Sequence, residues 1–357
     1  MRHFCIMKKT ATLFAFSLLI SGLKGQAQTP ANQNTPASLY NIAQKIPLSG
    51  DGSWDLITLD ETNGMLYVSH ENQVNVIDSR TRKSVGVIPG TKGVHGIAVA
   101  PKLHKGFTSN GKDTSVTVFS LDNFKVLKRI KVTGLKPDMI LFDSFTSRVF
   151  VFNGKTKNVT VINADSDKVI STIALTGKPE LAVSDTKGRL FLNLEDKSEV
   201  CVINSSSLKV EKSWPIAPGK EATGIAMDME HHRLFIGCDN KMMVIMNSDN
   251  GTVIAAVPIG DKVDGVAYDP GLKRAYSSNG DGTLTVIKET DPNTFDLVEN
   301  FKTQKGAKTL ALNPVNHWLY LPVADYLPGS ADDDDNPKAK PGIKPGTFGV
   351  IVVRLEE

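Results

Sequence analysis

The stretch FVFNGKTKNVTVI, residues 150–162, has two close counterparts in the same chain. FTSNGKDTSVTVF covers residues 107–119, and AYSSNGDGTLTVI covers residues 275–287. Each copy reads as two short strands rich in Val, Ile or aromatic residues, separated by a polar turn that begins with Asn-Gly. A pair of strands that recurs at a regular spacing indicates a repeat protein.

Seven units of this kind follow one another along the chain. Each unit has four short apolar segments, for example MILFD (139–143), RVFVF (148–152), VTVIN (159–163) and KVISTIALTG (168–177). An aromatic residue marks the second segment of each unit, at intervals of 40 to 44 residues: Tyr67, Phe107, Phe150, Phe191, Phe235, Tyr276 and Tyr320. Four strands at this period are typical of a β-propeller blade, whereas a β-sandwich or a solenoid would not repeat this pattern seven times. We therefore predict an all-β fold, a seven-bladed β-propeller of four-stranded antiparallel blades.

The two ends of the chain supply the parts of one blade. The last unit stops at its third strand, GVIVVRLEE (349–357), while NIAQKIPLSG (41–50) has the pattern of a fourth strand. Pairing of this N-terminal strand in the last blade would close the ring and protect its edges. The propeller is predicted to span residues 38–357, after a flexible segment at 28–37.

Residues 1–27 have the features of a secretory signal peptide. Arg2, Lys8 and Lys9 precede a short apolar run, and GQA ending at Ala27 fits a small-x-small cleavage site. The alternative is a single N-terminal membrane anchor. We expect a monomeric periplasmic or secreted protein that is not inserted in a membrane after cleavage.

The cleaved chain would be nearly neutral. Of 41 Lys and Arg residues, four lie in residues 1–27, which leaves 37 against 38 Asp and Glu. A net charge of −1 gives no general attraction to nucleic acid, although it leaves room for a local basic patch. The two remaining cysteines, Cys201 and Cys238, could form a disulfide, but their strand positions favour two buried free thiols. CxxCH is absent, so no covalent haem is expected.

The unit NGMLYVSHENQVNVIDSRTRKSVGVIPG (63–90) resembles the YVTN repeat of YncE-like bacterial β-propellers, and this resemblance extends over the whole predicted mature chain. It implies a seven-bladed propeller in the cell envelope. The haem-binding propeller of periplasmic nitrite reductase and the propeller lactonases resemble the chain more distantly. Binding of single-stranded DNA is attributed to one member of the YncE-like family. Propellers have many unrelated functions, so the resemblance does not define the chemistry.

Blade topology predicts that two positions of each unit meet at one mouth of the central channel. The residue at the start of the first strand is Asp55, His95, Asp138, Glu180, Thr223, Asp264 or Lys308. Three residues after the aromatic come His70, Asn110, Asn153, Leu194, Cys238, Asn279 and Val323, and the next position adds Glu71, Glu195 and Asp239. The candidate binding residues are Asp55, His70, His95, Asn110, Asp138, Asn153, Glu180, Glu195, Asp239, Asp264, Asn279 and Lys308. Simple turn chemistry is the alternative explanation for Asn-Gly.

Two further features bear on the predicted mouth. Residues 323–347 form a long loop in the last blade, either a flap at the mouth or a disordered segment. Its run Asp332–Asp335 could bind calcium, but it lacks the turn glycine and the distal Glu of a calcium loop. The remaining histidines of the mature chain are predicted to lie in exposed turns on the opposite face, without a function: His104, His231, His232 and His317.

Three functions are compatible with this pattern. The first is a binding protein whose mouth recognises a small polar ligand, a cation or a partner protein. The second is a metal-assisted lactonase or other hydrolase, in which Asp138, Glu180 or Asp264 holds a divalent cation and His95 or His70 is the base. The third, binding of single-stranded nucleic acid, rests on the resemblance alone and would require a basic groove with stacking aromatic residues. The residues favour binding first, then hydrolysis, then nucleic acid.

Overall fold

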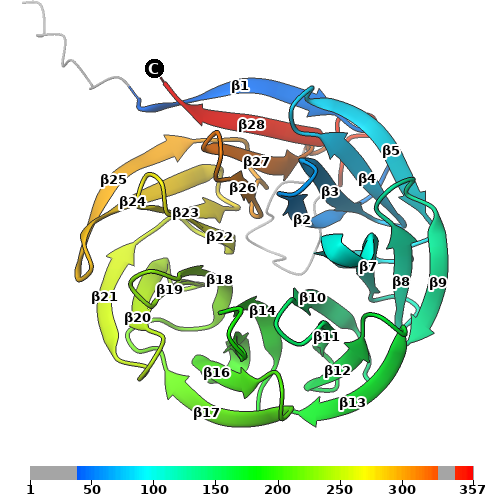
Figure 1. The fold of residues 1–357 in the computed structure, drawn as a ribbon. Helices are drawn as coiled ribbons and strands as arrows, with labels where there is room; N and C mark the ends of the chain where they lie inside the picture. Colours follow the sequence, from blue (N-terminus) through cyan, green and yellow to red (C-terminus); the bar gives the residue numbers. More distant parts are fainter. Residues whose placement is uncertain (1–37, 329–341, 357) are drawn as a thin grey trace, which may run out of the picture. The chain divides into compact units, whose positions relative to one another are not determined.

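The computed structural model describes residues 38–328 and 342–356, and these form a ring of seven four-stranded antiparallel sheets (Figure 1). The predicted seven-bladed β-propeller is therefore confirmed. The predicted signal peptide and the segment at 28–37 lie outside the described residues. No helix in the described ranges is long and apolar enough to cross a membrane.

Six blades are built from four consecutive strands, which run in order from the channel to the outer rim. Along the first half of the chain these strands are β2 (Trp54–Asp60), β3 (Met65–His70), β4 (Gln73–Asp78), β5 (Lys83–Pro89), β6 (Val94–Ala100), β7 (Lys105–Asn110), β8 (Ser115–Ser120), β9 (Val126–Lys131), β10 (Pro137–Asp143), β11 (Arg148–Asn153), β12 (Asn158–Asn163) and β13 (Lys168–Ala174). The next three blades contain β14 (Pro179–Ser184), β15 (Arg189–Leu194), β16 (Glu199–Asn204), β17 (Lys209–Pro215), β18 (Ala222–Asp228), β19 (Arg233–Cys238), β20 (Met242–Asn247), β21 (Val253–Pro258), β22 (Val263–Asp269), β23 (Arg274–Asn279), β24 (Thr283–Asp291) and β25 (Thr294–Lys302). Two short 3₁₀ helices, η1 (Pro101–Leu103) and η2 (Glu195–Lys197), lie in turns.

The seventh blade joins the two ends of the described chain. It contains β26 (Ala311–Asn313), β27 (Trp318–Val323), β28 (Gly349–Leu355) and, on its outer side, β1 (Tyr40–Pro47). β1 pairs antiparallel with β28, from Tyr40 opposite Leu355 to Pro47 opposite Gly349 (Figure 1). The predicted closure of the ring by the N-terminal strand is confirmed.

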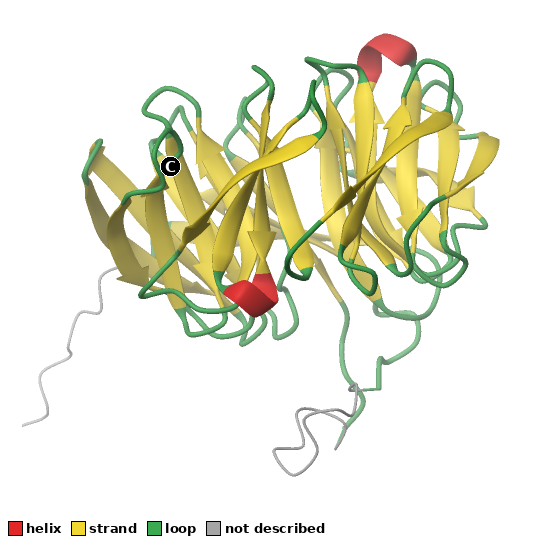
Figure 2. Ribbon diagram, turned by 90° about the horizontal axis from the view of Figure 1, so that it is seen from below, coloured by secondary structure: helices red, strands yellow, loops and turns green. Residues whose placement is uncertain are grey.

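The core lies between neighbouring blades. All seven repeat aromatics are fully buried, and the second and third strands of most blades are buried on both faces, as in the successive Val, Phe and Ile residues of β11 and β12. The outer strands are mostly exposed; in β9 only Ile130 is buried. Full burial of a large apolar side chain contributes roughly 1.5–3 kcal/mol, so the periodic aromatics hold each blade against the next. Figure 2 shows the same strands from the side, with the turns gathered on two opposite faces.

Cys201 and Cys238 are both buried and unbonded, in agreement with the interpretation of two free thiols. Burial raises the pKa of each thiol, to about 11 for Cys201 and about 12 for Cys238. Neither cysteine is therefore a reactive thiolate near neutral pH.

The described parts of the predicted 323–347 flap lie beside the channel mouth. Tyr326 forms an isolated antiparallel bridge with Ile343, and its ring stacks on Trp54 with centroids 6.4 Å apart. Trp54 opens β2 and lines the mouth. Residues 329–341, with the calcium alternative at Asp332–Asp335, lie outside the described residues.

Candidate binding site at the channel mouth

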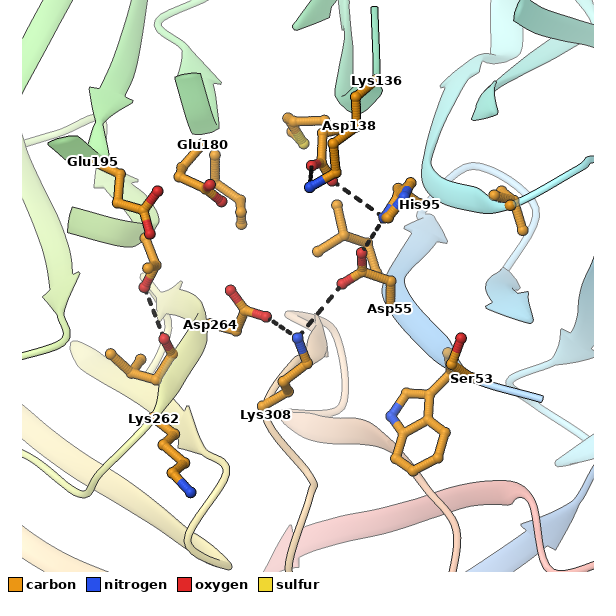
Figure 3. Close-up of a pocket in the computed structure, with 18 of the residues that line it drawn as sticks. Ser53, Asp55, His95, Lys136, Asp138, Glu180, Glu195, Lys262, Asp264 and Lys308 are labelled. Carbon is orange, nitrogen blue, oxygen red and sulfur yellow. Dashed lines mark hydrogen bonds and ion pairs between the residues drawn. The ribbon is translucent and has the colours of Figure 1, made fainter. Parts of the chain in front are cut away.

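A cavity of about 800 Å³ occupies the mouth where the inner strands begin. The predicted first-position residues of all seven blades line it: Asp55, His95, Asp138, Glu180, Thr223, Asp264 and Lys308. Glu71, Glu195 and Asp239, from the turns that follow the second strands, line it as well. Figure 3 shows the labelled side chains arranged around a common central space.

A break in strand pairing places these side chains in the channel. In six blades the register between the first and second strands shifts near the start of the inner strand, for example between Trp54 and Ile57 in β2 and between Val94 and Ile97 in β6. Asp55 and His95 lie inside these two irregularities. A bulge leaves a residue outside the ladder and turns its side chain away from the regular alternation. The repeated irregularity, which the sequence pattern did not reveal, therefore places six of the seven first-position residues; the seventh, Lys308, precedes β26, which pairs regularly with β27.

Four of the expected site residues do not line the cavity: His70, Asn110, Asn153 and Asn279. The strand register explains this difference from the sequence-based expectation. Asn110 is paired with Val94, the residue before His95, and Asn153 is paired with Pro137, the residue before Asp138. Cross-strand partners share one face of a sheet, whereas consecutive residues point to opposite faces. The asparagines therefore point into the blades.

Each asparagine ties the second strand of its blade to the third. The Asn153 amide donates to Asn158 Oδ1 at 2.9 Å and to Thr160 Oγ1 at 3.0 Å. Asn110 and Asn279 make the same type of contact with hydroxyl groups of their own third strands. All three side chains are fully buried. They satisfy polar groups inside the blade, which is the structural reason for the repeated Asn.

The glycine of Asn-Gly has a different role from the one that turn chemistry suggests. Gly111, Gly154 and Gly280 are absent from the positions with positive φ, which include the later turn residues Thr114 and Lys157. A Cβ on Gly111 would lie 2.8 Å from His95 Nε2. At this blade the glycine leaves room for a side chain of the ring.

His70 also belongs to a blade. It is 1% exposed, and its ring lies on Phe348 with centroids 3.9 Å apart. Burial lowers the pKa of this imidazole. A neutral, covered histidine of this kind is a packing residue and cannot act as a base in the cavity.

One side of the ring is a connected set of ion pairs (Figure 3). His95 Nδ1 lies 2.6 Å from Asp55 Oδ2 and 3.2 Å from Asp138 Oδ1. Burial opposes protonation of His95, but the hydrogen bond to Asp55 and the charge of Asp138 outweigh it and raise its pKa. Lys308 pairs with Asp264 and lies 3.9 Å from Asp55 Oδ1. The charge of Asp264 is the main cause that raises the pKa of Lys308.

The other side of the ring is less well neutralised. Lys178 forms ion pairs with two carboxylates: its Nζ lies 2.7 Å from Glu180 Oε1 and also contacts Glu195 Oε2. Burial raises the pKa of Glu180 to about 7 even though Lys178 opposes the shift. Asp239 has no Lys, Arg or His nitrogen within 4.0 Å in the part of the chain that the structure describes. Partial burial, followed by the charges of Glu195 and Glu221, raises the pKa of Asp239 to about 6.

Eight acidic side chains and four lysines line the cavity, and two further lysines, Lys178 and Lys241, pair with acids of this lining. The eight acids are Asp55, Glu71, Asp138, Glu180, Glu195, Asp239, Asp261 and Asp264, and the four lysines are Lys112, Lys136, Lys262 and Lys308. Burial is the main cause of the raised pKa values of Glu180 and Asp239, and neighbouring carboxylates add to it. The mouth is therefore an acidic cavity with its excess negative charge on the Glu180 side.

The three cation ligands expected from the sequence, Asp138, Glu180 and Asp264, do not form one group in the structure. Asp138 forms a group with Asp55 and His95, in which one ligand atom of each residue lies within 4.8 Å of the others. Glu180 and Asp264 instead form ion pairs with Lys178 and Lys308. Imidazole and carboxylate donors at this spacing fit a divalent ion such as Zn²⁺.

Sequence reasoning missed the lysines that accompany the acidic ring. Lys136 lies 3.5 Å from Asp138, and Lys178 lies 2.7 Å from Glu180, in each case two residues before the acid. Lys262 precedes Asp264 by the same spacing and also lines the cavity. The recurring Lys-x-acid pattern at the start of the inner strands could have predicted these lysines from the sequence.

Comparison with known proteins supports the fold. No family model matches the chain, and no curated protein matches it in sequence. The chain is similar in structure to the WD40 repeats of RRP9 (TM-score 0.72, 9% identity, covering 88% of this chain and 97% of that chain) and to U3-55K (TM-score 0.73, 9% identity, 88% and 98%). It is also similar to hydrazine synthase of Kuenenia stuttgartiensis (TM-score 0.65, 18% identity, 74% and 91%). At these identities the likeness establishes a β-propeller and no more.

Proposed function

We propose that this protein is an exported, YncE-like binding protein whose channel mouth binds a small organic cation. The observation that carries the proposal is the excess of carboxylates around Glu180, Glu195 and Asp239, which the lysines of the described ring do not balance. A cationic ligand would supply the missing charge, and its N–H groups would donate to the carboxylate oxygens.

The size and layout of the cavity favour an organic cation over a bare metal ion on this side. A volume of about 800 Å³ is within the usual range for small-molecule sites. Glu180 and Glu195 already converge on Lys178, whereas Asp239 faces the cavity from another blade. Carboxylates that are spread around a space this large suit a molecule with two or more separated ammonium groups.

Two sequence features support the cellular part of the proposal. The features of residues 1–27 support export, and the repeat exemplified by residues 63–90 supports membership of the YncE-like family. The acidic mouth opposes binding of single-stranded nucleic acid there, because phosphates would meet eight acidic side chains.

Thermal unfolding in the presence of defined cations tests the proposal. Spermidine and putrescine should raise the melting temperature, because a ligand that binds only the folded state stabilises it by mass action. Glu180→Gln combined with Asp239→Asn should remove this shift, whereas Glu211→Gln, on the exposed outer strand β17, should retain it. No shift in the wild-type protein, or equal shifts in all three proteins, would contradict the proposal.

A second function, metal-assisted hydrolysis, is favoured by one observation, the Asp55–His95–Asp138 group. A metal ion there could activate water, with the cavity admitting the substrate. Lys308 and Lys136 already lie close to these carboxylates, which weakens the attraction for a cation. Metal analysis of the purified protein and of Asp138→Asn decides this alternative: a bound metal that is lost in the variant supports it, and a metal-free wild-type protein rejects it.

A further inference from the structure

A second group of metal-ligand type lies on the face opposite the mouth, between two neighbouring blades. Asp228 ends β18, His231 lies in the following turn, and Glu289 lies near the end of β24 in the next blade. One ligand atom of each residue lies within 4.8 Å of the others. Asp228 and Glu289 are each 2% exposed. The prediction that His231 is simply an exposed turn histidine is therefore corrected, because two buried carboxylates flank it.

Glu289 departs from the repeat. In five other blades the residue just after the third strand is small or apolar and buried: Ser79, Leu121, Ala164, Ser205 and Ser248. Glu289 occupies the same position, since its backbone N–H bonds to a carbonyl of the preceding turn, Lys273 O, as the N–H of Ser248 bonds to His232 O. β24 and β25 are also lengthened to nine residues each, so this blade carries Glu289 within an extended hairpin.

One oxygen of the buried Glu289 carboxylate has no hydrogen-bond donor. Tyr268 donates to Oε2 at 2.5 Å, but Oε1 has no hydrogen-bond partner and lies 3.4 Å from His231 Nδ1. Nδ1 can carry only one proton, and it lies closer to Asp228 Oδ2, at 2.7 Å. The imidazole therefore cannot satisfy both carboxylates, and Oε1 is directed into the group without a partner.

The described surroundings supply no other positive charge to this oxygen. Arg233 is the nearby cation, but its guanidinium donates to Pro292 O, to the backbone oxygens of His231 and His232, and to Asn293 Oδ1. Asp228 also accepts the backbone N–H groups of Glu230 and His231, whereas Glu289 Oε1 has no donor. A buried carboxylate oxygen without a donor is costly unless another proton or cation is present.

We propose that Asp228, His231 and Glu289 form a binding site for a divalent transition-metal ion that links two blades. Two ligand atoms, each about 2.1 Å from one tetrahedral ion, lie roughly 3.4 Å apart. The distance from His231 Nδ1 to Glu289 Oε1 is 3.4 Å, and the 2.7 Å hydrogen-bond distance to Asp228 Oδ2 would lengthen when the Nδ1 proton is lost. An imidazole ligand favours Zn²⁺-like ions over Ca²⁺ or Mg²⁺. On binding, the Nδ1 proton passes to solvent, and Nδ1 and the two carboxylates become ligands.

Other features of the group suit such a site. The His231 side chain is 21% exposed, so solvent reaches the group and can complete the coordination. Tyr268 holds the second Glu289 oxygen and is a positioning residue. A simpler explanation accounts for Asp228 and His231 only. In another blade, Thr146 donates to Asp143, three residues earlier, at 2.6 Å and so caps the turn. His231, three residues after Asp228, could cap its own turn in the same way. That explanation leaves the buried Glu289 unexplained. The proposal is independent of the proposed function at the mouth.

Zinc titration by calorimetry tests the proposal. All proteins carry Asp138→Asn, so that the Asp55–His95–Asp138 group does not contribute, and are treated with chelator beforehand. We expect this background protein to bind one Zn²⁺ at pH 7.5. Glu289→Ser, which restores the residue type of Ser248, and His231→Thr, which copies Thr146, should each weaken binding at least tenfold. Glu230→Gln, a change at an adjacent exposed acid, should bind as the background does.

Circular dichroism checks that each variant is folded. If Glu289→Ser does not fold, His231→Thr decides alone, because it preserves the turn cap. Absence of zinc binding in the background protein overturns the proposal. Equal affinity in the folded ligand variants and the background protein also overturns it, because the ion would then bind elsewhere.

Discussion

Two sets of polar residues lie almost side by side at the channel end of the blades, yet they have opposite environments. Asp138 and its counterparts line the cavity, whereas Asn153 and its counterparts are fully buried. Asn153 is opposite Pro137, one residue before Asp138. This single-residue offset, together with the bulge, sends one set into the channel and the other into the blade. Proximity to the mouth is therefore insufficient evidence for a binding role. Whether a side chain reaches the channel depends on which face of the sheet it occupies, and a shift of one residue along the strand changes that face.

The asparagines stabilise the blades, whereas the carboxylates of the cavity are available to a ligand. The side-chain amide nitrogens of the buried asparagines donate to oxygen atoms on the third strands of their own blades. Among the carboxylates of the cavity, Glu180 shares Lys178 with Glu195, and Asp239 has no cationic partner within 4.0 Å among the described residues. Burial raises the pKa of both Glu180 and Asp239, so ionisation of these two groups is opposed in the folded state. Mutations in the first set should affect stability, and mutations in the second set should affect binding.

The largest expected effect comes from removing β1, because both sets require a closed ring. A chain that begins at Gly52 loses the buried Tyr40 and Ile46 and exposes the edge of β28. Burial of these two side chains alone corresponds to about 3–6 kcal/mol. Urea unfolding of this chain and of one that begins at Gln28 measures the difference. Equal free energies of unfolding would show that the closing strand is dispensable.

The next largest effect is expected at Asn153. Asn153→Ala removes two buried hydrogen bonds to β12 and should lower the free energy of unfolding by about 2 kcal/mol. Asn300→Ala, at an exposed position on β25, should change it by less than about 0.5 kcal/mol. Cation binding by Asn153→Ala should be unchanged. If Asn153→Ala keeps wild-type stability but loses cation binding, Asn153 is a binding residue like the carboxylates of the cavity, and the distinction between the two sets is wrong.

A smaller effect of opposite sign is expected at Glu180. Its pKa is raised to about 7 in the folded protein, above its ordinary value of about 4.3, so the folded state binds the proton more tightly. Stability is therefore lost as pH rises from about 4 to about 7. Glu180→Gln should be more stable than the wild-type protein at pH 8, by on the order of 1 kcal/mol, with little difference at pH 4.

Urea unfolding at the two pH values measures this effect. Lys178 keeps Glu195 as a partner in the variant, so the change does not strand a buried lysine. A Glu180→Gln protein that is less stable than the wild-type protein at pH 8 would mean that the ring carboxylate stabilises the fold, as the asparagines do.

The repeat made the fold and much of the ring predictable. Seven regularly spaced aromatics define the blades, and the strand missing from the last unit identifies β1 as its partner. The orientation of Asn110 could not be predicted because it depends on a bulge that leaves no mark in composition. Glu289 was overlooked for another reason: its importance comes from His231 in the preceding blade, a contact that spacing along one repeat cannot show.

The most direct test of the account is whether cation binding at the mouth displaces a proton from Glu180. Calorimetric titration with spermidine at pH 6.5, in two buffers of different ionisation enthalpy, measures the protons released on binding. Because Glu180 has a pKa of about 7, it is largely protonated in the ligand-free protein at this pH. We predict proton release in the wild-type protein and a much smaller release in Glu180→Gln. Binding without proton release, or with equal release in both proteins, would contradict it.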